Sequence, residues 1–177
     1  MRIPLRLAAS GLALAVLGVV APGSSPAAQS STAIDKAYLG TWKLNVAKST
    51  YENATPPREG TRVHEDRGNG FVLVIQDGVN AQGNKTHSEY VYKPDGKDYP
   101  LAAPNQTSIQ RIALKSVDAF TVTYQIKMDG RVTTNGKRTL SKDGRTMTLE
   151  NTGTNPQGQR THTVSMYDKQ MAGATTR

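Results

Sequence analysis

Residues 120–128 read FTVTYQIKM, nine residues in which apolar and polar side chains alternate without a break. Successive side chains of an extended strand point to opposite faces, so this period of two indicates a β-strand with one buried face and one solvated face. The residues expected on the buried face are Phe120, Val122, Tyr124, Ile126 and Met128. A single buried face has to be covered by other strands.

The chain on both sides of this segment supplies such strands. Short β-rich runs alternate with turns rich in Gly, Asn, Asp and Pro, as in all-β proteins. Strands are expected at residues 42–45, 61–67, 71–75, 86–93, 108–114, 131–141, 146–151 and 160–168, after one helical turn within 34–39. Short hairpins in series favour an all-β fold, an antiparallel up-and-down meander of 8–10 strands closed into a β-barrel, because closure removes exposed edges. A two-sheet sandwich is the alternative.

The turn at residues 143–144 predicts which side chains of the last hairpin face inward. A two-residue turn at this Asp-Gly pair would place Leu140 opposite Met147 and Arg138 opposite Leu149. Because Met147 and Leu149 alternate with polar residues, they are expected inside, and Arg138 with them.

The preceding hairpin has to agree with this parity. A three-residue loop at residues 128–130 would pair Ile126 with Val132 and keep both inside. A bulge at residues 135–136, which would turn Arg138 outward, is the alternative.

The N-terminal segment has the features of a secretory signal peptide. A basic start is followed by an apolar run over residues 7–20 and by small residues, and cleavage is expected near residues 27–30. An uncleaved anchor is the alternative. The expected organisation is a signal peptide at 1–28, a lead-in at 29–38, the barrel domain at 39–169 and a flexible tail at 170–177. The protein is therefore expected to be exported, to the periplasm or the extracellular medium.

Composition narrows the classes of partner. The formal net charge is +8, but the basic residues are scattered singly, which argues against a nucleic-acid partner. No membrane span is expected after signal cleavage, and a monomer is expected. The chain has no cysteine, so the barrel has to be stable without disulfides.

The start of the first strand carries a resemblance to a known group of barrels. Residues 39–44 read LGTWKL, which resembles the Gly-x-Trp opening of the calycins, that is, lipocalins and fatty-acid-binding proteins. The wider pattern, with AKS at 47–49, DGKDYP at 95–100, SKDG at 141–144 and YDKQ at 167–170, resembles a family of small exported bacterial lipocalin-like proteins of unassigned function. The resemblance implies a calycin-type barrel in which Gly40 opens the first strand and Trp42 plugs the closed end. Residues 49–60 contain two prolines and are too short for the helical lid of fatty-acid-binding proteins.

Five side chains are candidates for ligand contacts inside the barrel. An inward Arg138 could hold a carboxylate through two parallel hydrogen bonds. Tyr90, Tyr92 and Tyr124 either line a cavity or fill a packed core. His162 shares a strand face with two apolar residues and is expected inside, as a second polar contact or as a hydrogen-bonded core histidine.

Three functions follow from these candidates. The first is an exported protein that binds a small, partly apolar ligand, which could carry a carboxylate. The second is a structural or interaction module of the cell envelope with a packed barrel and no small ligand. The third, a barrel enzyme, has little support because no catalytic motif and no nucleophilic cysteine are present, so no catalytic residue is proposed. The histidine spacing gives no metal-chelating frame, and neither a metal nor a cofactor is expected.

Overall fold

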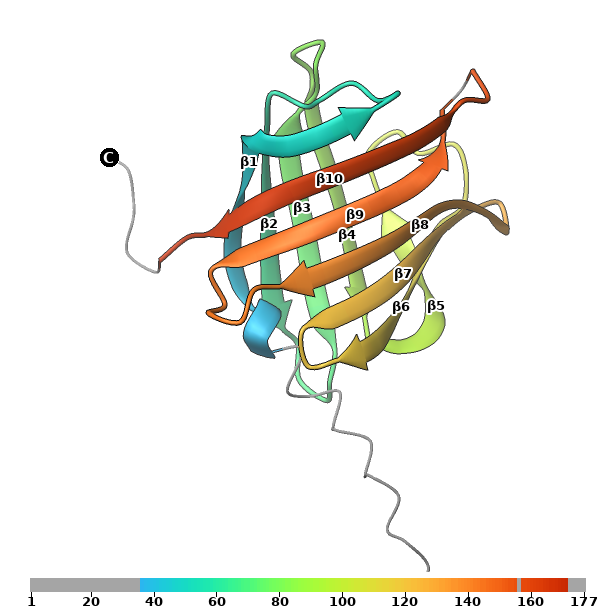
Figure 1. Cartoon of the computed structure of the whole chain (residues 1–177). Helices are drawn as coiled ribbons and strands as arrows, with labels where there is room; N and C mark the ends of the chain where they lie inside the picture. Colours follow the sequence, from blue (N-terminus) through green and yellow to red (C-terminus); the bar gives the residue numbers. More distant parts are fainter. Residues whose placement is uncertain (1–35, 156, 172–177) are drawn as a thin grey trace, which may run out of the picture.

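Ten strands form one closed antiparallel barrel in which each strand pairs with the next along the chain and β1 pairs with β10 (Figure 1). The computed structural model describes residues 36–155 and 157–171. The predicted signal peptide lies outside these residues, as do most of the lead-in and of the C-terminal tail. The up-and-down barrel without a helical lid is confirmed. The strands are β1 (Gly40–Glu52), β2 (Glu59–Asp66), β3 (Val72–Val79), β4 (Lys85–Tyr92), β5 (Asp95–Ala102), β6 (Gln110–Asp118), β7 (Thr121–Met128), β8 (Arg131–Leu140), β9 (Thr146–Thr154) and β10 (Arg160–Lys169).

A single helical turn at residues 36–38 lies at one end of the barrel (Figure 1). Its Tyr38 is fully buried, and the Tyr38 hydroxyl lies 2.8 Å from the carbonyl oxygen of Phe120 and 3.2 Å from that of Arg138. Trp42 is also fully buried, and its Nε1 donates to the Tyr38 carbonyl at 2.8 Å. These hydrogen bonds hold the helical turn against β1, β8 and the turn before β7. The buried Tyr38 and Trp42 side chains close this end of the barrel.

The hydrophobic core fills the closed half of the barrel. In this half, large apolar side chains from several strands form one cluster with Trp42 and Tyr38. They include Val72, Val74, Leu114, Val122, Leu140 and Met147. Such a core is what the alternating strand pattern requires, since the inward side chains of a small barrel meet at its axis. Within the described residues, no helix is both long and apolar enough to cross a bilayer.

The hairpin of β8 and β9 has the predicted register. Leu140 pairs with Met147 and Arg138 pairs with Leu149, so the inward placement of Arg138 is confirmed. The bulge that would have turned Arg138 outward does not occur in this hairpin.

The predicted three-residue loop between β7 and β8 is wrong. Asp129 and Gly130 both have positive φ, 48° and 80°, and form a two-residue turn that pairs Met128 with Arg131. The register then shifts by one residue between Lys127 and Ile126, which pairs with Thr134. A bulge therefore restores the parity that a longer loop was expected to restore.

Three side chains expected inside are exposed, for two local reasons. Val132 lies between the turn and the bulge, where the parity is reversed, and is 46% exposed. Phe120 and Met128 flank the two ends of β7, beside turns, and each is 39% exposed. Of the β7 side chains expected inside, only Val122 and Tyr124, in the middle of the strand, are buried.

The strand β5 was not predicted. Its first residues, Asp95 and Gly96, have a turn signature, and in the structure they form an irregularity in the pairing with β6. Pro100 interrupts the run and cannot donate a ladder hydrogen bond. Only two residue pairs join β5 to β4, so this strand closes the barrel weakly.

Candidate functional site

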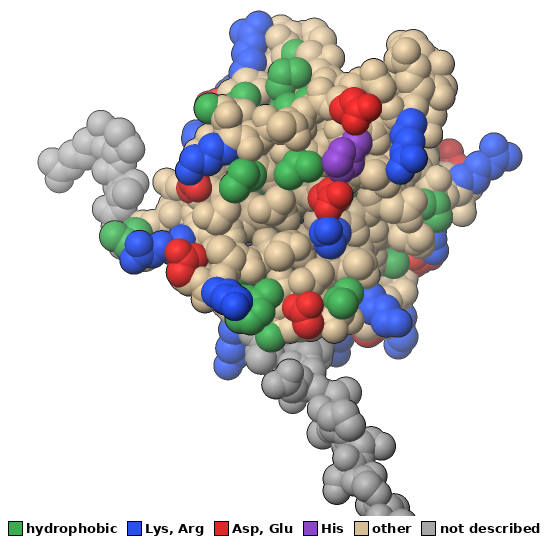
Figure 2. Space-filling model, in the orientation of Figure 1, with side chains coloured by type: hydrophobic (Ala, Val, Ile, Leu, Met, Phe, Trp, Pro, Cys, Tyr) green, Lys and Arg blue, Asp and Glu red, His purple; other side chains and the backbone are tan. Residues whose placement is uncertain are grey.

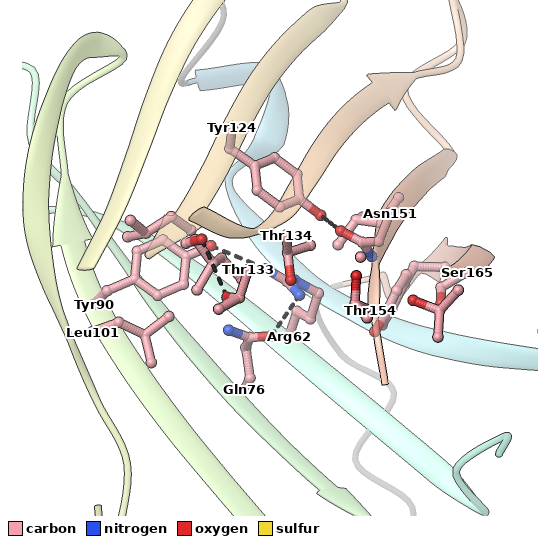
Figure 3. Close-up of a pocket in the computed structure, with 16 residues that line it drawn as sticks. Arg62, Gln76, Tyr90, Leu101, Tyr124, Thr133, Thr134, Asn151, Thr154 and Ser165 are labelled. Atoms are coloured by element: carbon pink, nitrogen blue, oxygen red, sulfur yellow. Dashed lines mark hydrogen bonds between the residues drawn. The ribbon is translucent and has the colours of Figure 1, made fainter. Parts of the chain in front are cut away.

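The half of the barrel away from the helical turn contains a cavity of about 420 Å³. Side chains from every strand except β1 line it. Figure 3 shows Arg62, Gln76 and Tyr90 together on one side of this space, with Asn151, Thr154 and Ser165 on the other. The interior is therefore packed at one end and hollow at the other, and a cavity of this size can hold a small organic molecule.

Arg62 is the charged residue of the cavity wall. The register of β2 against β3 places Arg62 opposite Gln76, and the side chain is only 6% exposed. Its guanidinium donates to Gln76 Oε1 at 2.6 Å and to the Tyr90 hydroxyl at 3.0 Å. The guanidinium carbon also lies 5.8 Å from the centre of the Tyr167 ring.

Arg138 lies deeper than the cavity wall and is 1% exposed. It donates to the Tyr92 hydroxyl at 3.2 Å and to the Tyr90 hydroxyl at 3.0 Å, and its guanidinium carbon is 5.4 Å from the Tyr38 ring centre. Burial opposes its charged form, but the surrounding phenol groups outweigh burial and raise the pKa of the guanidinium above its usual value. Arg138 is therefore a buried cation at neutral pH.

The Tyr90 hydroxyl accepts a hydrogen bond from each of the two guanidinium groups. Among residues 36–155 and 157–171, no carboxylate lies within ion-pair distance of Arg62 or Arg138. The Nε atoms of both arginines are buried without a partner in this part of the chain. The barrel interior thus carries two positive charges that phenols and an amide solvate and that no acid neutralises.

A third basic residue, His64, is buried beside these cations. Its ring stacks on Tyr38 with a centroid distance of 6.3 Å, and neither ring nitrogen has a partner within the described chain. Burial, together with the charges of Arg138, Arg62 and Lys169, holds the pKa of His64 well below its usual value. His64 is therefore neutral at pH 7.

Tyr124 reaches the cavity by crossing a glycine. Tyr124, Gly136 and Asn151 stand in one row across β7, β8 and β9, and the Tyr124 hydroxyl donates to Asn151 Oδ1 (Figure 3). A Cβ atom on Gly136 would lie 2.2 Å from the Tyr124 ring, so only glycine leaves room for this ring. Burial raises the pKa of Tyr124 to about 12, which keeps the phenol neutral and able to donate.

The inward placement predicted for His162 is wrong. Its ring lies outside the barrel, 3.1 Å from Glu150 Oε1, and the other oxygen of Glu150 is 2.7 Å from Lys137 Nζ. The inner face of β10 carries Thr161, Ser165 and Tyr167 instead. The two apolar neighbours that suggested burial, Val164 and Met166, are half-buried on the outer face.

Arg138 and His162 consequently lie on opposite sides of the barrel wall, so this pair cannot act together on one substrate. The outer face around β8–β10 is mostly uncharged and polar, with acidic and basic side chains scattered over it (Figure 2). Over the described ranges, no three His, Asp or Glu side chains gather as a metal-binding group.

The other predicted site residues, apart from the exposed Gly40, lie inside the barrel. Tyr90 and Tyr124 line the cavity, whereas Tyr92 packs beside Arg138 in the closed half. Gly40 begins β1 with a φ of 110°, and Trp42 is fully buried in the core. A ligand-binding role for these residues remains a prediction.

The sequence analysis missed Arg62. The Gly-Asn-Gly turn at residues 68–70 pairs Asp66 with Val72, and the same parity places Arg62 and His64 on the face of Val72 and Val74. Turn length alone would not have placed Arg62 inside, because residues 71–75 are apolar on both faces and do not show which face is inward.

Comparison with known proteins identifies the fold and no more. No family model matches the chain, and no curated protein matches it. Among solved structures, the fluorescent protein UnaG is similar at 14% identity, with a TM-score of 0.51 over 76% of this chain and 98% of that chain. A single-site mutant of UnaG gives a TM-score of 0.52 at 14% identity over 77% and 99%. The barrel EF1p2_mFAP2b, solved bound to DFHBI, has 10% identity and a TM-score of 0.51 over 80% and 100%. The fold is thus a closed antiparallel barrel like those of UnaG and EF1p2_mFAP2b.

Gly136→Ala should destabilise the protein by about 1–3 kcal/mol, because the new methyl group overlaps the Tyr124 ring. Urea unfolding measures the loss. In a Tyr124→Ala background, the same glycine change should cost much less, since the overlapping ring is gone. Equal costs in the two backgrounds would contradict the close approach.

The stability of the protein should fall as the pH drops below about 6.5, because the unfolded chain protonates His64 and the native barrel does not. The slope from this one group is at most about 1.4 kcal/mol per pH unit. Urea titrations at several pH values between about 7.5 and 5 measure it, a range above that in which most carboxylates titrate. His64→Leu should remove most of the slope, whereas His87→Gln, at an exposed site, should keep it.

Proposed function

We propose that this protein binds a small, partly apolar organic anion in the barrel cavity and holds the acidic group of that anion at Arg62. The supporting observation is the pair of buried guanidinium groups that share the Tyr90 hydroxyl and have no acid partner within the described chain. Burying an unpaired charge is costly, and an anion entering the cavity would offset that cost.

Arg62 is suited to contact the anion directly because it lines the cavity. A guanidinium offers parallel N–H donors that match a planar carboxylate, and the pair is strengthened where water is excluded. Arg138 does not line the cavity; its charge acts through the shared Tyr90 hydroxyl and adds to the positive potential at Arg62. We therefore assign the direct contact to Arg62 and a supporting role to Arg138.

The remainder of the cavity offers apolar contact. Leu101, Ile112, Ile126 and Leu149 lie in its wall, and burial of a ligand's apolar surface against them contributes about 25 cal/mol per Å². The cavity favours a binding protein over a packed interaction module. A barrel of the same fold is bound to DFHBI, which is consistent with a small molecule inside such a barrel.

Arg62→Gln should weaken binding of the anionic aromatic probe 1-anilinonaphthalene-8-sulfonate at least about tenfold, because it removes a charged hydrogen-bond donor. Isothermal titration measures the affinity. Arg62→Lys, which keeps the charge but loses the planar fork, should bind with intermediate affinity. The neutral analogue N-phenyl-1-naphthylamine should bind the native protein and Arg62→Gln equally.

The matched control is Arg111→Gln on β6, an exposed arginine outside the cavity lining, which should leave probe affinity unchanged. Urea unfolding of each variant verifies that the barrel remains folded. An Arg62→Gln protein that is folded and binds the anion as tightly as the native protein would refute the proposal.

We propose further that the protein is a member of the small exported bacterial lipocalin-like family that its sequence resembles, and that it acts as a monomer in the periplasm or outside the cell. The supporting feature is the N-terminal pattern of residues 1–28. Expression of the full chain in a bacterium, followed by mass determination of the exported protein, should give a start near residues 28–31. Recovery of the uncut chain from the cytoplasm alone would contradict export.

A further inference from the structure

The cavity has two chemically different walls. On β5, β6 and β7 its lining includes Leu101, Ile112 and Ile126. On β8, β9 and β10 the lining is dominated by hydroxyl and amide groups, from Thr133, Thr134, Asn151, Thr154, Thr161 and Ser165. Figure 3 shows Leu101 on one side of the cavity and Thr154 and Ser165 on the other. A ligand that fills this space meets hydrocarbon on one side and hydrogen-bonding groups on the other.

Two of these hydroxyls flank a notch. Thr134, Gly153 and Thr161 stand in one row across β8, β9 and β10. A Cβ atom on Gly153 would lie 2.8 Å from the Thr133 carbonyl oxygen, 3.5 Å from Thr161 Oγ1 and 3.6 Å from Thr134 Oγ1, so a backbone oxygen and two hydroxyl oxygens converge at the glycine. This Thr134–Gly153–Thr161 notch lies in the cavity lining.

The hydroxyl groups of the notch are not engaged within the protein. In the part of the chain that the structure describes, neither Thr134 nor Thr161 has a side-chain hydrogen bond, whereas Thr133 donates to a backbone carbonyl. Nearby Asn151 accepts from Tyr124 through its oxygen, which leaves its amide nitrogen as a donor. The notch therefore presents both donors and acceptors to whatever occupies the cavity.

A plain hydrocarbon tail is a poor occupant of such a wall. Methylene groups laid against the two threonine hydroxyls would displace water from them and offer no hydrogen bond in return, which costs free energy. A site whose polar groups bond a ligand hydroxyl discriminates strongly against the analogue that lacks it. The notch thus disfavours a saturated fatty acid and favours a hydroxyl-bearing ligand.

The separation of the notch from Arg62 gives the shape of the ligand. Thr161 and Tyr167 stand six residues apart on β10, and the Tyr167 ring centre lies 5.8 Å from the Arg62 guanidinium carbon. Inward side chains shorten this gap, but a ligand that meets both groups still needs its acid and its hydroxyl at opposite ends. The rings of Tyr90, Tyr124 and Tyr167 in the lining provide aromatic surfaces for a flat scaffold between them.

We infer that the site selects an elongated aromatic monocarboxylic acid with a hydroxyl group at the end remote from the carboxylate, and that the Thr134–Gly153–Thr161 notch binds this hydroxyl. The inference rests on the proposed function, because the carboxylate end depends on Arg62. It adds the class of ligand and the residues that discriminate it from a fatty acid.

Three acids test the inference by isothermal titration on the native protein: 4′-hydroxybiphenyl-4-carboxylate, biphenyl-4-carboxylate and decanoate. The hydroxylated acid should bind about 3- to 10-fold more tightly than its parent, the value of one neutral hydrogen bond, and decanoate should bind most weakly. Thr134→Val and Thr161→Val should each reduce the preference for the hydroxylated acid and leave biphenyl-4-carboxylate affinity equal or higher. Thr139→Val, on the outer face of β8, should change neither affinity.

The outcomes separate the inference from the proposed function. If decanoate binds as tightly as the hydroxylated acid, or if the preference persists in both valine variants, the ligand class is wrong. In that case the anion site stands as long as Arg62→Gln weakens all three acids. If none of the acids depends on Arg62, both the proposed function and the ligand class are overturned. Thermal unfolding of the valine variants verifies that they fold.

Discussion

The interior of this barrel depends on one phenol. The Tyr90 hydroxyl accepts a hydrogen bond from Arg62 and another from Arg138, at 3.0 Å each, and so joins the packed closed half to the hollow half. Two like charges tend to separate in a low-dielectric interior, and only a group that solvates both can hold them near one another. At the closed end, the Tyr38 ring lies 5.4 Å from the Arg138 guanidinium carbon and partly offsets the cost of burying this cation.

Glycines in the strands shape the hollow half. Each of two glycines stands between two inward side chains on neighbouring strands. Gly136 lies between Tyr124 and Asn151, and Gly153 lies between Thr134 and Thr161. At Gly136 the missing side chain lets an aromatic ring lie across the wall, and at Gly153 it lets the Thr133 carbonyl oxygen approach the backbone between two hydroxyls. A glycine weakens a strand by itself, so its presence inside β8 and β9 is explained by the close approach that it permits.

The sequence was informative where alternation and turn length act together, and uninformative where the backbone is irregular. The Asp-Gly turn at residues 143–144 and the apolar alternation of β9 were sufficient to place Arg138 inside. The bulge at Thr133 and the irregular start of β5 could not be predicted, because a bulge reverses side-chain parity without a residue type that identifies it. The inward placement predicted for His162 was wrong for another reason. The outer face of β10 also carries apolar residues, so the apolar neighbours of His162 did not identify the inner face.

We propose Arg62 rather than Arg138 as the direct ligand contact because the two arginines lie at different depths in the barrel. An arginine at the closed end is held by the phenols of Tyr90 and Tyr92 and is screened from the cavity by the side chains above it. Arg62 is slightly more exposed and lines the cavity, so its side chain faces both protein groups and open space, although Nε lacks a partner within the described residues in both arginines. In the proposed function, Arg138 therefore adds to the positive potential of the interior and Arg62, which lines the cavity, makes the direct contact with the anion.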